Sequence, residues 1–157
     1  MSPSDPIPDI SEFPVVHAVA VRFVDVDAMG HVNNANYATY FEEARVAYIR
    51  RARPEAFSDR DLGATFPFIL LDLYCRYLSP VRAGDALEVG VRLSRLGGKS
   101  FDFEYLVVAR GDGRAVAVGR TTQVYFNYAE NRTEPVPDAL REAFARVEAG
   151  RCTGRES

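Results

Sequence analysis

The spacing of apolar positions along the chain changes from a period of two residues to about 3.6 and then back to two. From Val15 to Phe23, alternate positions are mainly apolar, which predicts a strand. Between Asn36 and Arg51 the apolar side chains recur every three or four residues and form one stripe: Tyr37, Tyr40, Phe41, Ala44 and Tyr48. This stripe predicts a long amphipathic helix that ends before Pro54.

The remainder of the chain is mostly strand in pattern. Four segments are predicted as strands: Phe66–Leu78, whose odd positions are apolar, then Leu87–Leu93, Phe101–Ala109 and Arg114–Asn127. Tight turns at Gly97-Gly98 and at residues 110–113 separate the last three strands, and a short helix is expected to begin near Pro137. One strand, one long helix, four successive strands and a short helix predict an α+β domain with an antiparallel sheet.

The length and composition fit one folded domain. The chain has 157 residues, of which 47% are hydrophobic and 26% are charged. Residues 1–12 and 150–157 are rich in polar residues and are predicted to be mobile tails, which leaves residues 13–149 as the domain. The first residues lack the features of a secretory signal, and no apolar run is long enough to cross a bilayer. We therefore expect a cytoplasmic protein with no membrane partner.

Charge and metal-binding residue types exclude several further classes. The net charge of −3, with both signs interspersed, argues against a dedicated nucleic-acid binder, so an anionic ligand would need a local cluster of cations. The chain has two cysteines, far apart, and two histidines, which makes a disulfide scaffold or a metal centre unexpected. We predict a site without a metal ion or another cofactor.

Polar residues gather where the first strand gives way to the long helix: Asp25, Asp27, His31, Asn33, Asn34 and Asn36. A helix N-terminus offers free N–H donors and a partial positive charge, and here a carboxylate stands beside it. An oxyanion stabiliser next to a base or nucleophile is what acyl transfer requires, and Gly30 permits a sharp turn between the two. The alternative is that the aspartates form local turns and that Asn33 and Asn34 only cap the helix.

This segment carries a family resemblance. The string from Asp25 to Tyr37, DVDAMGHVNNANY, followed by FEEAR at 41–45, resembles the hot-dog-fold acyl-CoA thioesterases of the 4-hydroxybenzoyl-CoA thioesterase type. The string LGGKSF at 96–101 is similar to their turn between two central strands. The resemblance covers Val15 to Tyr128. It implies a long helix wrapped by a five-stranded antiparallel sheet, in homodimers that share two active sites at the interface and are often paired into tetramers.

The resemblance also implies roles for individual residues. Asp27 matches the catalytic carboxylate, and Asn34 matches the position whose backbone N–H polarises the thioester carbonyl. Gly30 and Tyr37 match positions that shape the turn and pack the helix, and Tyr37 is also a candidate for contact with the substrate. His31 completes the set of candidate catalytic residues, because its unperturbed pKa suits proton transfer near neutral pH.

The binding residues expected for the substrate lie partly in the second string. Lys99 falls where the family often places a cation for the phosphates of coenzyme A, and its neighbour Ser100 is assigned to the same site. Asn33 is the remaining candidate substrate-binding residue. Some relatives carry arginines where this chain has Gly97 and Gly98.

The pattern of residues leaves several questions open. Asp25 has the same strand parity as Asp27, and we assign it a structural role because adjacent like charges oppose ionisation. Glu43 on the helix is an alternative base. The string from His31 to Asn34 is also similar to plant acyl-carrier-protein thioesterases, which offers a second acyl carrier. The same fold could also serve a non-catalytic acyl-CoA sensor or a hydratase.

Overall fold

The computed structural model describes residues 6–57 and 67–150. Residues 1–5, 58–66 and 151–157 lie outside the described part, which includes the predicted strand start at Phe66 and most of the predicted C-terminal tail. The elements occur in the predicted order. They are η1 (Ile10–Glu12), β1 (Val15–Ala20), η2 (Phe23–Asp25), α1 (Asn36–Ala52), η3 (Pro54–Phe57), β2 (Phe68–Tyr77), β3 (Ala86–Leu96), β4 (Ser100–Ala109), β5 (Ala115–Asn127), β6 (Arg132–Thr133) and α3 (Asp138–Ala149), where η marks a short 3₁₀ helix.

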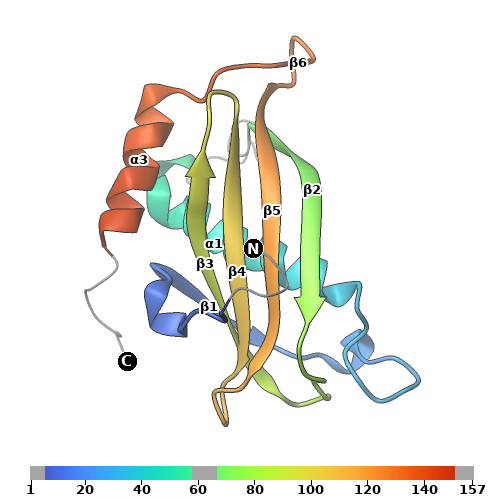
Figure 1. The fold of residues 1–157 in the computed structure, drawn as a ribbon. Coiled ribbons are helices and arrows are strands. Elements are labelled where there is room, and N and C mark those ends of the chain that lie inside the picture. The colour runs from blue at the N-terminus through green and yellow to red at the C-terminus, as the bar shows by residue number, and fades with distance from the viewer. Residues whose placement is uncertain (1–5, 58–66, 151–157) are drawn as a thin grey trace.

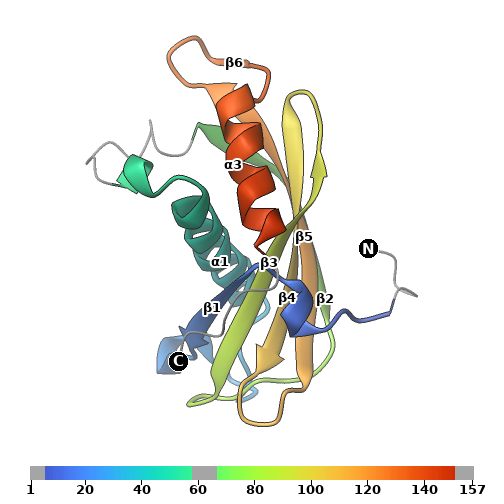
Figure 2. The same ribbon diagram turned by 90° about the vertical axis from the view of Figure 1, so that its left-hand side faces the viewer.

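The strands form one antiparallel sheet that curls around the long helix. Its order is β1-β3-β4-β5-β2, and the two-residue β6 extends the ladder on β5. Helix α1 lies along one face of the sheet, and α3 packs beside it near the end of the sheet at which β3 and β4 are joined (Figures 1 and 2). This arrangement confirms the predicted α+β class and the five-stranded sheet around a helix. No helix in residues 6–57 or 67–150 is both long and apolar enough to cross a membrane.

The predicted stripe of α1 is the face that the helix buries against the sheet. All five of its residues are at most 3% exposed. Phe41 stacks on Tyr105 of β4 with ring centroids 4.5 Å apart, and it lies over Gly119 of β5, where a Cβ atom would overlap the ring. Towards the other end of the helix, Tyr48 meets Phe103 and Phe144, which ties α3 into the same core. The helix forms because this single apolar face has a continuous surface to cover.

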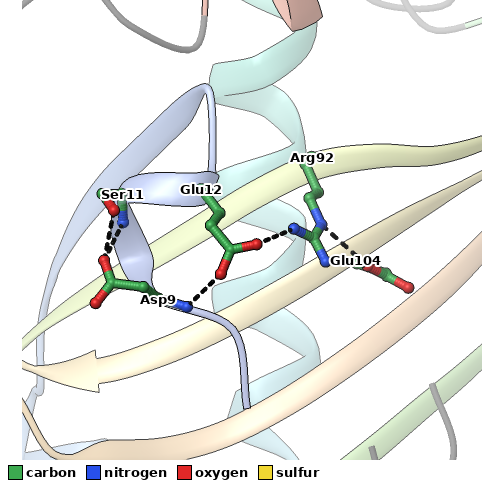
Figure 3. A network of polar contacts seen from close by, with 5 residues as sticks. All are labelled: Asp9, Ser11, Glu12, Arg92 and Glu104. Carbon is green, nitrogen blue, oxygen red and sulfur yellow. Dashed lines mark hydrogen bonds and ion pairs between the residues drawn. The ribbon is translucent and has the colours of Figure 1, made fainter. Parts of the chain in front are cut away.

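The opposite face of the sheet is covered in part by the segment before β1. Figure 2 shows α1 and this N-terminal segment on opposite sides of the sheet. Phe13 packs on an apolar cluster of β4 and β5, and Gly90 leaves the room for Ile10 and Phe13. Glu12 forms an ion pair of 3.3 Å with Arg92, which in turn pairs with Glu104 at 3.0 Å (Figure 3).

The predicted tail boundary falls inside this segment. Asp9 caps η1 by accepting a hydrogen bond from the Ser11 N–H, and the Asp9 N–H donates to Glu12 (Figure 3). Residues 9–12 therefore have a defined place on the sheet. Mobility of the predicted tail 1–12 remains a prediction only for the residues before Asp9.

Two of the predicted strands differ from those observed. The first ends at Ala20 rather than at Phe23, because the chain turns there into η2 and leaves Phe23 89% exposed. The predicted strand β2 forms, but the apolar side chains at its odd positions do not make up a buried face of the sheet. A register shift interrupts its pairing with β5 near Leu71, and Leu71 and Leu73 are 64% and 38% exposed. Because β2 lies at the edge of the sheet, one side of the strand has no neighbouring strand in the described part of the chain, and Leu71 and Leu73 stay exposed.

The contact between Phe41 and Gly119 gives a test of the core. Gly119→Ala is expected to lower the free energy of unfolding by about 1–3 kcal/mol, because the added methyl group overpacks the ring of Phe41. Gly111→Ala is the matched control, since nothing lies within 4 Å of the Cβ position in that exposed turn. Urea denaturation of both variants at one protein concentration measures the difference, and equal stabilities would contradict the packing.

Candidate active site

The segment between η2 and α1 folds into a tight loop with Asp27 and His31 at its base. The Asp27 N–H donates to the His31 carbonyl at 2.9 Å, and Val26 and Val32 form an antiparallel bridge just outside this pair. The Gly30 N–H closes the turn by donating to the Asp27 carbonyl at 3.0 Å. Gly30 has a φ of +79°, a conformation that L side chains rarely adopt, so the turn requires a glycine.

The Asp27 carboxylate is partly exposed, and only one of its two oxygens accepts a hydrogen bond from the described residues. Its Oδ1 accepts a hydrogen bond from the Met29 N–H at 2.9 Å, which is the kind of local turn that would also form without any chemical role. Its other oxygen has no hydrogen-bond partner in the described part of the chain. The loop therefore orients the carboxylate and leaves one oxygen available for a ligand.

Asp25 fixes the position of this loop through hydrogen bonds of its side chain and its carbonyl. Its side chain is fully buried and accepts hydrogen bonds from the Arg22 N–H at 2.9 Å, from Arg22 Nη2 at 2.7 Å and from the Tyr40 hydroxyl at 3.0 Å. Its carbonyl accepts from the Asn33 N–H and from the Asn36 side chain, each at 2.8 Å. The prediction that Asp25 and Asp27 share one strand face is wrong, because η2 turns Asp25 inward and leaves Asp27 at the surface.

The electrostatics of Asp25 follow from these contacts. The hydrogen bonds from Arg22 hold the pKa of the Asp25 carboxyl below its ordinary value, although burial opposes ionisation. A carboxyl group with a lowered pKa in the folded state stabilises the fold above its unfolded pKa, and that contribution is lost as the pH falls through the lowered value. The loop therefore depends on an ionised Asp25.

The start of α1 presents a free donor near the loop. The N-cap position is Ala35, and the Asn33 side chain accepts from the Ala35 N–H at 2.9 Å. Of the two predicted caps, Asn33 thus accepts a backbone N–H just before the helix, although neither occupies the N-cap position itself. The N–H of Asn34 has no acceptor among the described residues, and the Asn34 carbonyl accepts from the Tyr77 hydroxyl at 3.2 Å. An unpaired N–H beside a helix start is a hydrogen-bond donor for an anionic or polarised oxygen.

Two residues from other parts of the fold support this position. Tyr37 is 3% exposed and contacts Tyr77 of β2 edge to face, with centroids 5.0 Å apart, and burial raises the pKa of Tyr37 to about 12. The Val81 carbonyl accepts from the Val32 N–H at 2.8 Å. Neither Tyr77 nor Val81 was predicted as part of the site, since the link depends on where β2 lies in the sheet.

Lys99 and Ser100 lie at the other end of the sheet. Ser100 is level with Val124 of β5, and Val124 is level with Ile69 of β2, whereas the hydroxyl that reaches Asn34 belongs to Tyr77 at the opposite end of β2. At about 3.3 Å per residue, Ile69 and Tyr77 are about 26 Å apart along β2. Within one protomer, the structure does not bring Lys99 and Ser100 to Asp27.

The turn that carries Lys99 is held by two arginines that the sequence did not single out. Arg141 of α3 donates to the carbonyls of Gly97 and Gly98, at 2.6 and 3.1 Å. Arg95 pairs with the carboxylate of Asp102 at 2.7 Å and donates to the Ser100 hydroxyl at 3.0 Å. The Lys99 side chain is exposed. Arg141 and Arg95 therefore fix the backbone on both sides of Lys99.

The alternative base Glu43 faces β1. Its carboxylate lies 3.5 Å from His17, whereas the neighbouring Glu42 lines a cavity on the side of β2. Two adjacent helix residues therefore serve different surfaces, and Glu43 is engaged with His17.

Residues 21–144 match the thioesterase-like superfamily. The chain is 36% identical over 94 residues to a putative esterase of Aquifex aeolicus, covering 60% of this chain and 72% of that protein. It is 26% identical over 124 residues to the long-chain acyl-CoA thioesterase FadM of Escherichia coli (strain K12), covering 79% and 92%.

Among solved structures, a thioesterase of Thermus thermophilus complexed with coenzyme A and Zn superimposes with a TM-score of 0.77 at 36% identity, covering 88% of this chain and 96% of that one. The superfamily match includes the Asp27 loop, α1 and all of the strands from β2 to β5. The chain therefore belongs to the thioesterase-like superfamily, and the prediction of a thioesterase with the hot-dog fold is confirmed.

Proposed function

We propose that the protein hydrolyses an acyl-CoA thioester to the free acid and coenzyme A. The observation that carries the proposal is the pairing of a half-free Asp27 carboxylate with the unpaired N–H of Asn34 at the start of α1. The relatives support the choice of carrier, because one is named a long-chain acyl-CoA thioesterase and another is complexed with coenzyme A. A cytoplasmic location and a mechanism without a metal ion stay predictions from the sequence.

The chemistry assigns each group a step. The thioester oxygen accepts from the Asn34 N–H, where the helix dipole stabilises the negative charge that develops on it. Asp27 either attacks the carbonyl carbon, which expels the thiolate and forms an anhydride that water then hydrolyses, or takes a proton from a water molecule that attacks the same carbon. In both routes the C–S bond breaks and the thiolate takes up a proton. The carboxylate is regenerated at the end.

The second part of the proposal concerns assembly. The edge strand β2 exposes apolar side chains, with Leu70 at 48%, Leu71 at 64% and Tyr77 at 46%. An open, apolar strand edge is a template for pairing with another chain. We infer a homodimer in which β2 of one protomer pairs antiparallel with β2 of its partner about a two-fold axis. Further pairing of dimers into tetramers stays a prediction.

This pairing would complete the active site. A two-fold axis through antiparallel β2 strands reverses one protomer relative to the other, so the Ile69 end of one strand meets the Tyr77 end of the next. Lys99 of the partner subunit and Ser100 of the partner subunit would then approach Asp27 and Asn34. Lys99 and Asp27, which are about 26 Å apart within a protomer, would then lie close together across the interface. The ammonium group of Lys99 of the partner subunit would reach the coenzyme A phosphates of a thioester bound at Asp27.

Asp27→Asn is the first test. Asparagine keeps the oxygen that accepts from Met29, so the loop is expected to fold, while the charge needed for attack or proton transfer is lost. The assay measures release of free thiol from a panel of acyl-CoAs by wild-type protein and by the variant. The kcat of the variant should be lower by ~10²–10⁴-fold, with little change in substrate binding. Asp138→Asn, an exposed carboxyl in the first turn of α3, is the control. Near-normal turnover of Asp27→Asn would show that the base is misassigned, and a wild-type protein that binds but never releases thiol would support the sensor.

Lys99→Ala tests the phosphate contact. KM for acyl-CoA should rise with little change in kcat, because a contact with a remote phosphate is made equally in the ground state and the transition state. The same acyl group on pantetheine, which lacks the nucleotide phosphates, should be hydrolysed equally by both proteins. Steady-state kinetics at low salt provide the measurement. An unchanged KM for acyl-CoA would remove Lys99 from the site.

Mixed dimers test whether the site is shared between protomers. If Asp27 works with Lys99 of the partner subunit, a dimer of one Asp27→Asn chain and one Lys99→Ala chain contains one intact site. Co-expression with two different affinity tags should then yield heterodimers with about half of the wild-type kcat/KM. If both residues act within one protomer, the heterodimer has no intact site and stays as impaired as its parents.

A further inference from the structure

A cavity lies between α1, β2 and β5, apart from the Asp27 loop of the same protomer. Its volume is about 180 Å³, and it is lined by Glu42, Arg45, Val46, Phe68, Leu70 and Gln123. A cavity of about 150 Å³ is known to hold a benzene molecule. The space is therefore sufficient for one ring or for a short acyl chain.

A chain of hydrogen bonds in the core fixes the polar wall of this cavity. Gln123 is fully buried, and its Nε2 donates to Thr121 Oγ1 at 2.7 Å. Thr121 shares a hydrogen bond of 2.8 Å with the Tyr105 hydroxyl, which also accepts from Arg45 Nη1 at 3.2 Å. Burial raises the pKa of Tyr105, so its hydroxyl stays protonated. The network holds the Gln123 amide by its nitrogen.

The other end of that amide is unpaired. Gln123 Oε1 is shielded from solvent and has no hydrogen-bond partner in the described part of the chain. Buried polar atoms nearly always have a partner, so an acceptor left open beside a cavity calls for a donor from outside the chain. The two charged residues that line the cavity, Glu42 and Arg45, have opposite signs and favour a neutral group over an ion.

We propose that this cavity binds the acyl group of the substrate and that Gln123 selects an acyl group carrying a hydroxyl, which donates its proton to Gln123 Oε1. The inference rests on the proposed acyl-CoA thioesterase function and on the β2 pairing. That pairing turns the Phe68 end of the strand, and the cavity with it, towards Asp27 of the partner subunit. The hydroxyl oxygen can in turn accept from Arg45, so one group satisfies both polar walls.

The test uses pairs of acyl-CoAs that differ by one hydroxyl, namely benzoyl with the hydroxybenzoyl isomers and hexanoyl with the hydroxyhexanoyl isomers. Wild-type protein should prefer one hydroxylated member over its parent by about 5–150-fold in kcat/KM, because the bound parent leaves the buried Gln123 acceptor without a partner. Gln123→Met keeps the length of the side chain and removes the acceptor. It should abolish the preference, so that each hydroxylated compound and its parent are hydrolysed by the variant with equal kcat/KM.

Asn127→Leu is the matched control, because this β5 amide bonds to Glu134 and does not line the cavity. It should retain the preference. Dissociation constants of the same pairs, measured by calorimetry in the Asp27→Asn background with and without Gln123→Met, separate this inference from the catalytic proposal. A hydroxyl preference in binding that disappears with Gln123→Met supports the cavity even if no thiol is released. Equal affinity for both members of every pair, or a preference that survives Gln123→Met, overturns the inference.

Discussion

The buried carboxylate of Asp25 is the interaction on which the proposed active site depends. A charge without solvent contact must be paired, and here Arg22 and Tyr40 supply the donors. Since Arg22 follows β1 and Tyr40 belongs to α1, the pairing fixes the end of a strand to a helix. The Asp25 carbonyl then receives the Asn33 N–H, which sets the position of the chain that enters α1. The proposed reactive groups lie on a short loop, but the ion pair between the buried Asp25 carboxylate and the exposed Arg22 determines the loop's path.

The candidate site residues lie at two opposite ends of the sheet. The Asp27 loop is attached to the Tyr77 end of β2, and the Lys99 turn is attached to the Ile69 end. In the proposed dimer, each protomer therefore contributes parts to two sites. The segment before β1 covers apolar residues on the outer face of the sheet, while the edge of β2 stays exposed. The surface that a second copy would cover is also the surface whose pairing would join the two halves.

The polar residues inside the curl of the sheet distinguish this core from a purely apolar one. Thr121 and Gln123 are both fully buried on β5, and they continue the hydrogen-bond chain that begins at Arg45. Buried polar networks are costly when one member lacks a partner. That cost is consistent with a binding role at Gln123, since packing alone would be served better by an apolar side chain at this position.

The sequence by itself determined the order of the elements, the buried stripe of α1 and the position of the loop between strand and helix, because each depends on residues that are neighbours along the chain. Periodicity predicted the helix from Asn36 to within one residue of its end, and the loop motif identified the family. Only the tertiary structure showed which groups Asp25, Tyr77 and Gln123 contact. Their partners lie on other elements, and burial, sheet order and strand ends are set by packing between distant segments. For the same reason, only the fold shows that Lys99 and Asp27 lie far apart within one protomer. They lie near opposite ends of the 10-residue strand β2, and the local sequence pattern does not reveal which residues lie at the same end of a sheet.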